Sequence, residues 1–303
     1  METARLGGSD LDGGGPVVSR VGLGCNQFGR KLDREATRAV VEAALEVGIT
    51  FFDTADIYGS GDSERFICAA LGERRAAVVL GTKFGQDESV PGPGGSRDHM
   101  RRALEASLDR LGTDVVDLYT YHRPDDVTPL EETLAAMQEL VDQGRVRWLG
   151  LSNVDAAQVA AAAASGVTVV AVQNRYSLLS RDDDAEVLPL CRRHGIGYVP
   201  YFPLASGLLT GKYRRGEPAP EGSRLAGRPI DDRELEAVEA LERLGAERGR
   251  SILELAVGGL ASIPGIASVI AGATSPEQVR ANAAAGAWHA SNDELDAIAR
   301  AVA

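Results

Sequence analysis

Four side chains with complementary acid–base chemistry occur in the first half of the sequence: Asp53, Tyr58, Lys83 and His122. A tyrosine phenol has a pKa of about 10, and a neighbouring ammonium group favours the phenolate and lowers that pKa. Lys83 can provide this charge, and Asp53 can be the counter-ion that keeps a buried lysine protonated. His122 can donate a hydrogen bond that orients a carbonyl oxygen. Together the four residues predict a proton donor aimed at a carbonyl group, an arrangement worth roughly 10²–10⁴ in rate.

These residues need a scaffold that brings distant parts of the chain to one place. Eight short apolar runs lack polar alternation, which is typical of parallel strands buried on both faces. The runs are Val21–Gly24, Thr50–Asp53, Val78–Thr82, Val116–Tyr121, Trp148–Ser152, Val169–Gln173, Gly197–Tyr201 and Ser268–Ala271. Helical patterns separate most of them, as after Asp33, where apolar residues recur at helical spacing. Eight such units in about 300 residues predict an α/β protein with a (β/α)8 TIM barrel.

An open doubly wound sheet is the competing architecture. It usually carries a GxGxxG turn, and in this chain Gln27 stands where the third glycine would belong. Helix starts are marked by Thr128-Pro-Leu-Glu131, interpreted as an N-cap threonine, a proline at N1 and a capping-box glutamate. Ser275-Pro-Glu-Gln278 repeats this pattern, and Asp155 precedes a third helix with Gln158 at N3.

Three segments exceed a minimal barrel. Ala205–Arg233 reads as a long loop, followed by an inserted helix from Asp231 to about Glu247. Gly85–Gly95 shows neither a helical nor a strand pattern, and a loop of this length is uncommon unless it covers a site or is disordered. The residues 292–303 predict a short amphipathic C-terminal helix. With no linker in between, we expect a single barrel domain over residues 1–303.

Composition narrows the classes of partner and the compartment. The 303 residues carry a net charge of −12, which disfavours nucleic acid and anionic membranes as partners. The three cysteines, Cys25, Cys68 and Cys191, form no CxxC pair, so we expect no metal site and no disulfide framework. The sequence shows no secretory signal and no apolar run of about 18 residues. We therefore expect a cytoplasmic protein that acts on a small molecule; its oligomeric state stays open.

Polar or ring-bearing residues stand where most of the predicted strands end. In a barrel the carboxyl ends of the strands meet at one rim, and that rim carries the function. Besides the four residues above, the rim would receive Ser152 and Asn153, Gln173, Tyr201 and Gly272.

At these positions the sequence resembles the aldo-keto reductase superfamily. The matching stretches are GITFFDTADIYG (Gly48–Gly59), GTKFG (Gly81–Gly85), DLYTYHRPD (Asp117–Asp125), LGLSNV (Leu149–Val154), YFPLASGLLTGKY (Tyr201–Tyr213) and AGATSPEQVRAN (Ala271–Asn282). The resemblance implies a barrel enzyme that reduces an aldehyde or ketone to an alcohol with a nicotinamide cofactor, usually NADPH. Its four catalytic positions match Asp53, Tyr58, Lys83 and His122.

The same resemblance implies a cofactor extended across the rim. Ser152, Asn153 and Gln173 would hold the carboxamide, and Tyr201 would stack on the nicotinamide ring. A loop would fold over the pyrophosphate with Leu204, Ser206, Gly207, Leu209 and the nearby cation Lys212. Gly272, Thr274, Gln278 and Asn282 would meet the adenosine end, where the helix that starts at Ser275 favours an anion such as a 2′-phosphate. Gln278 replaces an arginine frequent in relatives, which weakens the case for NADPH over NADH; we expect NADPH, with NADH as the less favoured cofactor.

Two other functions use the same residues differently. Lys83 at a strand end can form a Schiff base in a lyase, although Asp53 as a partner would keep the amine charged rather than nucleophilic. A non-catalytic NADP(H)-binding subunit, like the channel-associated relatives in the superfamily, is the third hypothesis. The short segment after Trp288 predicts an open substrate pocket.

Overall fold

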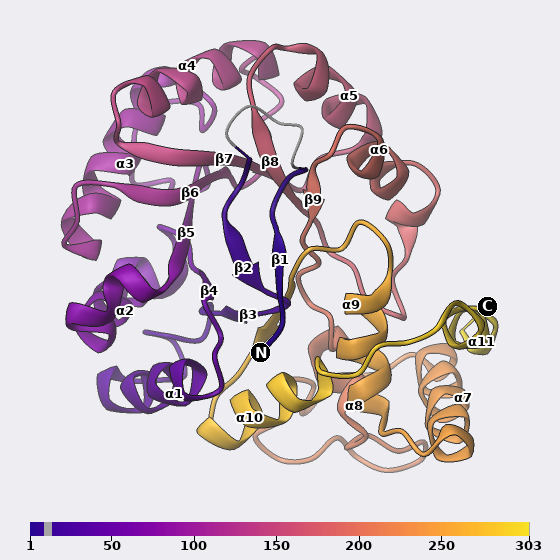
Figure 1. The fold of residues 1–303 in the computed structure, drawn as a ribbon. Coiled ribbons are helices and arrows are strands. Elements are labelled where there is room, and N and C mark those ends of the chain that lie inside the picture. Colours follow the sequence, from indigo (N-terminus) through magenta and orange to yellow (C-terminus); the bar gives the residue numbers. More distant parts are fainter. Residues whose placement is uncertain (9–13, 303) are drawn as a thin grey trace.

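The computed structural model describes residues 1–8 and 14–302. Eight parallel strands form one sheet in the order β10-β3-β4-β5-β6-β7-β8-β9, with helices around them (Figure 1). The strands are β3 (Val21–Gly24), β4 (Phe51–Asp53), β5 (Val79–Phe84), β6 (Val116–Tyr121), β7 (Val146–Ser152), β8 (Val169–Gln173), β9 (Gly197–Tyr198) and β10 (Val269–Gly272). Their positions agree with the eight runs expected from the sequence.

The sheet closes into a barrel between its first and last members. The amide of Tyr198 donates to the carbonyl of Gly265, and the amide of Ala267 donates to the carbonyl of Tyr198. Farther along, the amide of Ile270 donates to the carbonyl of Pro200, and Tyr201 pairs with Ile270 in an isolated parallel bridge. The seventh run is therefore regular only over Gly197–Tyr198, and bridges continue it to Tyr201. The fold is the predicted (β/α)8 barrel.

The helices cover the outside of the sheet and bury apolar stripes against it. They are α1 (Arg34–Glu46), α2 (Asp62–Leu71), α3 (Arg97–Leu111), α4 (Leu130–Asp142), α5 (Ala156–Ala164), α6 (Val187–Arg193), α7 (Asp232–Arg248), α8 (Ile252–Glu254), α9 (Leu260–Ser262), α10 (Pro276–Ala285) and α11 (Asn292–Ala301). A π-helical segment, Leu255–Gly259, joins α8 to α9. The inserted helix α7 and the C-terminal helix α11 pack on each other. None of the described helices is long and apolar enough to cross a membrane.

Most expected helix starts are confirmed by their caps. Ser275 caps α10 with Pro276 in the first turn, and Asp155 and Gln158 form a full capping box at α5. The expected start at Thr128 is wrong. Pro129 is the N-cap of α4 and the helix begins at Leu130, because the Asp125 carboxylate accepts hydrogen bonds from both the amide and the hydroxyl of Thr128.

An N-terminal hairpin, absent from the sequence expectations, closes the bottom of the barrel. It pairs β1 (Thr3–Arg5) with β2 (Val17–Ser19) in antiparallel register and crosses the middle of the ring of strands in Figure 1. Leu6 and Val18 are fully buried and belong to an inner cluster with Phe51, Leu118 and Val170. The hairpin leaves the opposite, carboxyl end of the barrel as the open end.

Candidate active site

Neighbouring strands deliver the four predicted catalytic side chains to one end of the barrel. Asp53 is the last residue of β4, and in the parallel register it lies opposite Gly81 of β5. Lys83 is two residues farther along β5 than Gly81. Residues two apart in a strand face the same side of the sheet, so Lys83 faces the same side as Gly81. Phe84 of β5 pairs with Tyr121 of β6, so His122 follows directly after the paired residues.

Tyr58 reaches the same place from the turn after β4. It begins the 3₁₀ turn Tyr58–Gly61, in which Gly59 has a φ of 56°. A Cβ on Gly59 would lie 2.7 Å from the carbonyl oxygen of Phe28, so the turn can approach the β3–α1 loop only with glycine at this position. The tight turn places the Tyr58 ring 6.0 Å from the His122 ring, centroid to centroid, with an edge-on angle of 81°.

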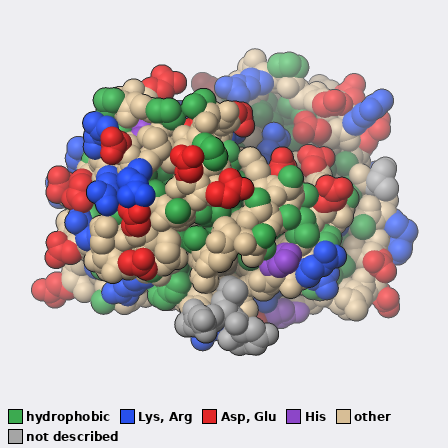
Figure 2. Space-filling view, turned by 90° about the horizontal axis from the view of Figure 1, so that it is seen from above, with side chains coloured by type: hydrophobic (Ala, Val, Ile, Leu, Met, Phe, Trp, Pro, Cys, Tyr) green, Lys and Arg blue, Asp and Glu red, His purple; other side chains and the backbone are tan. Residues whose placement is uncertain are grey.

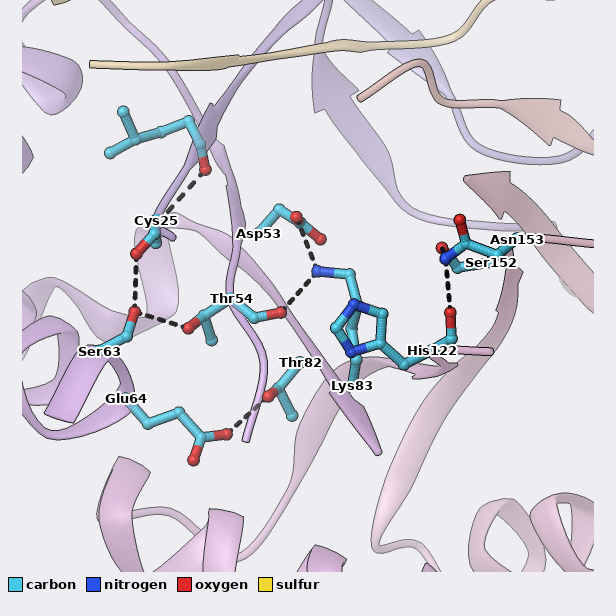
Figure 3. A network of polar contacts seen from close by, with 11 residues as sticks. Cys25, Asp53, Thr54, Ser63, Glu64, Thr82, Lys83, His122, Ser152 and Asn153 are labelled. Carbon is cyan, nitrogen blue, oxygen red and sulfur yellow. Dashed lines mark hydrogen bonds and ion pairs between the residues drawn. The ribbon is translucent and has the colours of Figure 1, made fainter. Parts of the chain in front are cut away.

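Lys83 is a buried ammonium with satisfied partners. Its Nζ donates to Asp53 Oδ2 at 2.8 Å and to the carbonyl oxygen of Thr54 at 2.7 Å (Figure 3). Nζ also lies 5.1 Å from the centroid of the Tyr58 ring. Burial lowers the pKa of Lys83, but Asp53 and Tyr58 more than offset this effect, so its pKa is raised overall. The amine therefore stays protonated, which disfavours the Schiff-base hypothesis.

The pKa expected for Tyr58 is wrong in direction. The sequence predicts a pKa lowered by Lys83, whereas burial raises the Tyr58 pKa above its ordinary value of 10.0 and the lysine charge offsets only part of this effect. Loss of hydration penalises the phenolate more than one ammonium neighbour stabilises it. Tyr58 is therefore a protonated hydroxyl near neutral pH, as a proton donor requires.

His122 is a neutral imidazole. Burial first, and then the charges of Lys83 and Arg123, lower its pKa to about 3. Its Nδ1 is buried and has no hydrogen-bond partner among the described residues. A neutral imidazole donates one N–H, so His122 can still donate a hydrogen bond to a carbonyl oxygen in the cavity.

The predicted carboxamide site is a hydrogen-bonded group at the ends of β7 and β8. Asn153, with a φ of 57°, donates from Nδ2 to the carbonyl oxygen of His122 at 2.8 Å and to Ser152 Oγ at 3.1 Å. Its Oδ1 accepts from the hydroxyl of Tyr201 at 2.6 Å. Asn153 thereby fixes the Tyr201 ring relative to the backbone of His122, and Gln173 lies buried at the end of β8.

A cavity of about 700 Å³ joins these groups, within the usual size range of ligand pockets. All but one of the predicted site residues line it: Asp53, Tyr58, Lys83, His122, Ser152, Asn153, Gln173, Tyr201, Leu204, Ser206, Gly207, Lys212, Gly272, Thr274, Gln278 and Asn282. Leu209 is the exception, because its side chain is fully buried in the hydrophobic core. From Gly85–Gly95 only Gln86 lines the cavity, and none of the described residues of α11 does.

The adenosine end of the predicted site is preorganised by side-chain contacts. Gln278 Oε1 accepts from the amide of Thr274 at 2.8 Å and from its hydroxyl at 3.1 Å. Ser275 Oγ caps the first turn of α10, and Asn282 Nδ2 donates to the carbonyl of Gly272 at 3.5 Å. With its oxygen engaged, Gln278 presents its amide NH₂ as a donor beside the helix N-terminus, a place that suits an anion.

The electrostatics of the cavity differ from those of the whole chain. Acidic and basic side chains are mixed over the face shown in Figure 2, and the chain as a whole has a net charge of −12. Six cationic side chains line the cavity, namely Arg30, Lys31, Lys83, Arg123, Lys212 and Arg224. Asp53 is the single carboxylate among the described lining residues, and it is paired with Lys83. The cavity is thus strongly positive and suited to an anionic ligand.

Sequence reasoning missed Arg30, Lys31, Arg123 and Arg224. Arg224 stacks its guanidinium 4.6 Å from the centroid of the Phe202 ring, in the loop that follows Tyr201. The only local signal was the run of arginines in this loop, which resembles a solvated surface segment. Arg123 directly follows His122 within the motif DLYTYHRPD, and no pattern in the sequence singles it out.

Comparisons with known proteins agree with this geometry. The sequence model of the Aldo/keto reductase family matches residues 20–303. A protein named probable voltage-gated potassium channel subunit beta from Oryza sativa is 37% identical over 301 residues, covering 93% of this chain and 90% of that protein. The L-glyceraldehyde 3-phosphate reductase of Escherichia coli K12 is 33% identical over 289 residues, covering 88% and 83%. A probable aldo-keto reductase 1 of Glycine max is 36% identical over 223 residues, covering 70% and 63%.

The barrel, the catalytic-type residues at its carboxyl end and a family match over nearly the whole chain agree with one another. The chain belongs to the aldo/keto reductase family of oxidoreductases.

Proposed function

We propose that the protein is an NADPH-dependent reductase that converts an aldehyde or ketone into the corresponding alcohol. The observation that carries this proposal is the buried Lys83–Asp53 pair, with an Nζ–Oδ2 distance of 2.8 Å, beside Tyr58 and His122 in the wall of a positive cavity. Family membership supports nicotinamide-dependent oxidoreduction of carbonyl compounds; the proton donor and the preference for NADPH are our proposal.

In the proposed mechanism the substrate carbonyl oxygen lies between Tyr58 and His122. The His122 N–H donates a hydrogen bond that orients this oxygen. A dihydronicotinamide held by Ser152, Asn153, Gln173 and Tyr201 would supply the hydride for the carbonyl carbon. Tyr58 gives its hydroxyl proton to the oxygen, which completes the alcohol. The phenolate left on Tyr58 is stabilised by the Lys83 ammonium, which Asp53 holds in place. In the reverse reaction Tyr58 would be the base.

The lining residues fit an extended dinucleotide. We propose that Ser152, Asn153 and Gln173 bind the carboxamide and that Tyr201 stacks on the nicotinamide. The segment of Leu204, Ser206, Gly207 and Lys212, with Arg224 added, would follow the pyrophosphate, because these two cations have no described carboxylate partner. Thr274, Gln278 and Asn282 would meet the adenosine end, and the positive lining with the α10 N-terminus supports a 2′-phosphate there. The three cysteines are free, which supports a reducing cytoplasmic location.

A cofactor-binding subunit without turnover is the second candidate function. It is favoured by the 37% identity to the rice protein named as a potassium channel β subunit. Against it stands the presence of Asp53, Tyr58, Lys83 and His122 in the wall of one cavity. Binding of NADPH without reduction of any aldehyde or ketone tested would favour the subunit over the enzyme.

The deciding experiment follows the loss of NADPH absorbance with a panel of aldehydes and ketones, for the wild type and for Tyr58→Phe. We expect Tyr58→Phe to lower kcat by roughly 10²–10⁴ while NADPH binding, measured by fluorescence, is retained. Tyr213→Phe is the matched control, because the Tyr213 hydroxyl is buried without a described partner and lies outside the cavity lining. Wild-type turnover in Tyr58→Phe would contradict the proton-donor role.

A further inference from the structure

Among the cations that line the cavity, Arg123 comes from a different part of the chain than Arg30, Lys212 and Arg224. Arg30 and Arg224 belong together, since the pKa of Arg224 is lowered first by burial and then by the charges of Arg30 and Arg228. Lys212 lines the same cavity and precedes Arg224 in the long segment after Tyr201, with its Nζ 5.3 Å from the centroid of the Tyr213 ring. Arg123 instead comes from the end of β6, directly after His122.

Arg123 lies at the catalytic end of the cavity. It lines the same cavity as Tyr58 and His122, and its charge lowers the pKa of His122 and opposes the rise in the pKa of Tyr201. Arg123 therefore shares one cavity with the residues proposed to act on the carbonyl, and Gln86 lines the same cavity.

Among the described residues, the guanidinium of Arg123 has no partner that would compete with a ligand. Arg123 forms no ion pair with any described carboxylate, and its side chain is exposed to the cavity mouth. Asp125, two residues along the chain, accepts hydrogen bonds from the amides of Gly95 and Thr128 and is engaged there. The carboxylate of Asp53, which also lines the cavity, is bound to Lys83.

We propose that Arg123 binds an anionic group of the substrate, so that the preferred substrates are aldehydes or ketones that carry a carboxylate or a phosphate near the carbonyl. A guanidinium holds either group through two parallel hydrogen bonds. Because Arg123 directly follows His122 and lines the same cavity, we expect a substrate oriented by His122 to place its charged group near Arg123 when a few bonds separate that group from the carbonyl. This inference rests on the proposed reductase function and adds its substrate class.

The test compares matched substrates that differ in charge. Succinic semialdehyde is paired with its methyl ester, and glyceraldehyde 3-phosphate is paired with glyceraldehyde, so that carboxylate and phosphate are probed separately. For each pair, kcat and KM are measured with NADPH in the wild type, Arg123→Gln, Arg123→Lys and the control Arg175→Gln. Arg175 is also exposed and also acts on the pKa of Tyr201, but it does not line the cavity.

We expect the wild type to prefer at least one charged member, and Arg123→Gln to reduce that preference by roughly 10- to 100-fold, mainly through KM of the charged substrate. Arg123→Lys should keep part of the preference, because the charge remains while the two-pronged geometry is lost. Arg175→Gln should leave the ratio between the paired substrates as in the wild type. Added NaCl should weaken the preference, since a charge at an open cavity mouth is screened.

Three results would overturn the inference. Equal kcat/KM for charged and neutral members in the wild type would show that no anion site exists. An equal loss of preference in Arg175→Gln would show that the preference arises from the positive potential of the protein surface and not from binding by Arg123. A rise of the NADPH Kd in Arg123→Gln with an unchanged substrate ratio would place Arg123 on the cofactor. Failure of every aldehyde, charged or neutral, would contradict the proposed reductase function instead.

Discussion

Asp56 is a buried carboxyl group that the proposed chemistry does not use. It is 2% exposed, and neither carboxyl oxygen has a hydrogen-bond partner among the described residues. Burial first, and then the charges of Glu64 and Asp87, raise its pKa from 3.8 to about 7. The native state therefore keeps Asp56 protonated at pH values where the unfolded chain has released the proton.

The pH dependence of stability follows from this difference. Below pH 3.8 Asp56 is protonated in both the native and the unfolded state, and its contribution to the free energy of unfolding is fully present. This contribution is lost as the pH rises through 7, with a slope of up to roughly 1.4 kcal/mol per pH unit. His122 acts in the opposite direction, because its pKa is lowered to about 3 and its contribution is present above 6.5 and lost as the pH falls. The two residues offset each other between these limits.

We expect Asp56→Asn to remove the pH-dependent contribution of Asp56 and to leave that of His122. Urea unfolding at pH 5.5, 6.5 and 7.5 should show that the stability of the variant relative to the wild type increases with pH, because the variant does not ionise. Asp114→Asn, at an exposed position, is the control and should show a constant difference. A pH-independent difference for Asp56→Asn would mean that Asp56 is not a protonated buried acid.

Asp125 organises two loops at the level of elements. Its carboxylate accepts from the amides of Gly95, Val127 and Thr128 and from the Thr128 hydroxyl, with distances of 2.8–3.0 Å. One side chain thus joins the end of the Gly85–Gly95 loop to the start of α4. These bonds also lower the pKa of Asp125, although burial opposes them.

We expect Asp125→Ala to loosen this junction. The loss of several hydrogen bonds to a partly exposed charged group should lower the unfolding free energy by about 1–3 kcal/mol and make Gly85–Gly95 more sensitive to limited proteolysis. Asp126→Asn is the matched control, because Asp126 is exposed, has no hydrogen bond among the described residues and has a φ of 57°, which asparagine tolerates. Unchanged cleavage of the loop in Asp125→Ala would show that other contacts hold it.

Helix caps were predictable where one side chain decided the start, and less so where two competed. Asp155 and Ser275 each cap the helix that the sequence assigned to them. Thr128 does not cap α4, because its amide and hydroxyl donate hydrogen bonds to Asp125 instead. A local sequence pattern does not show which of two possible partners a threonine will bind. The β1–β2 hairpin was missed because its strands have three residues each, too few for a periodic signal.

At the scale of the whole molecule, the barrel was predictable because its period repeats along the entire chain. The convergence of Asp53, Tyr58, Lys83 and His122 on one cavity was predictable for the same reason, since each stands at or near a strand end. The cations Arg30 and Arg224 come from long loops, and only tertiary structure shows that they face one cavity. The roles of individual site residues and the single-domain organisation stay predictions.

The barrel bottom offers a test that separates stability from activity. Leu6 is fully buried between the hairpin and the inner cluster, so Leu6→Ala should lower the unfolding free energy by about 2–5 kcal/mol. Reductase kcat should be retained at a temperature where the variant is folded, because the catalytic residues lie at the other end. Val17→Ala, at a position 48% exposed, is the control and should have a much smaller effect. A loss of kcat in folded Leu6→Ala would show that the two ends are coupled.

The hairpin is synthesised before the barrel residues against which it packs. Leu6 packs in a cluster that includes Val170, Val199 and Ile270, residues that are synthesised much later. Until these residues are synthesised, the apolar side chains of the hairpin have no surface to pack against and are accessible to chaperones or to other nascent chains. A purification tag fused to Met1 would lie beside the hairpin, at the end of the barrel opposite the cavity. We expect such a tag to leave turnover unchanged and to lower the yield of folded protein.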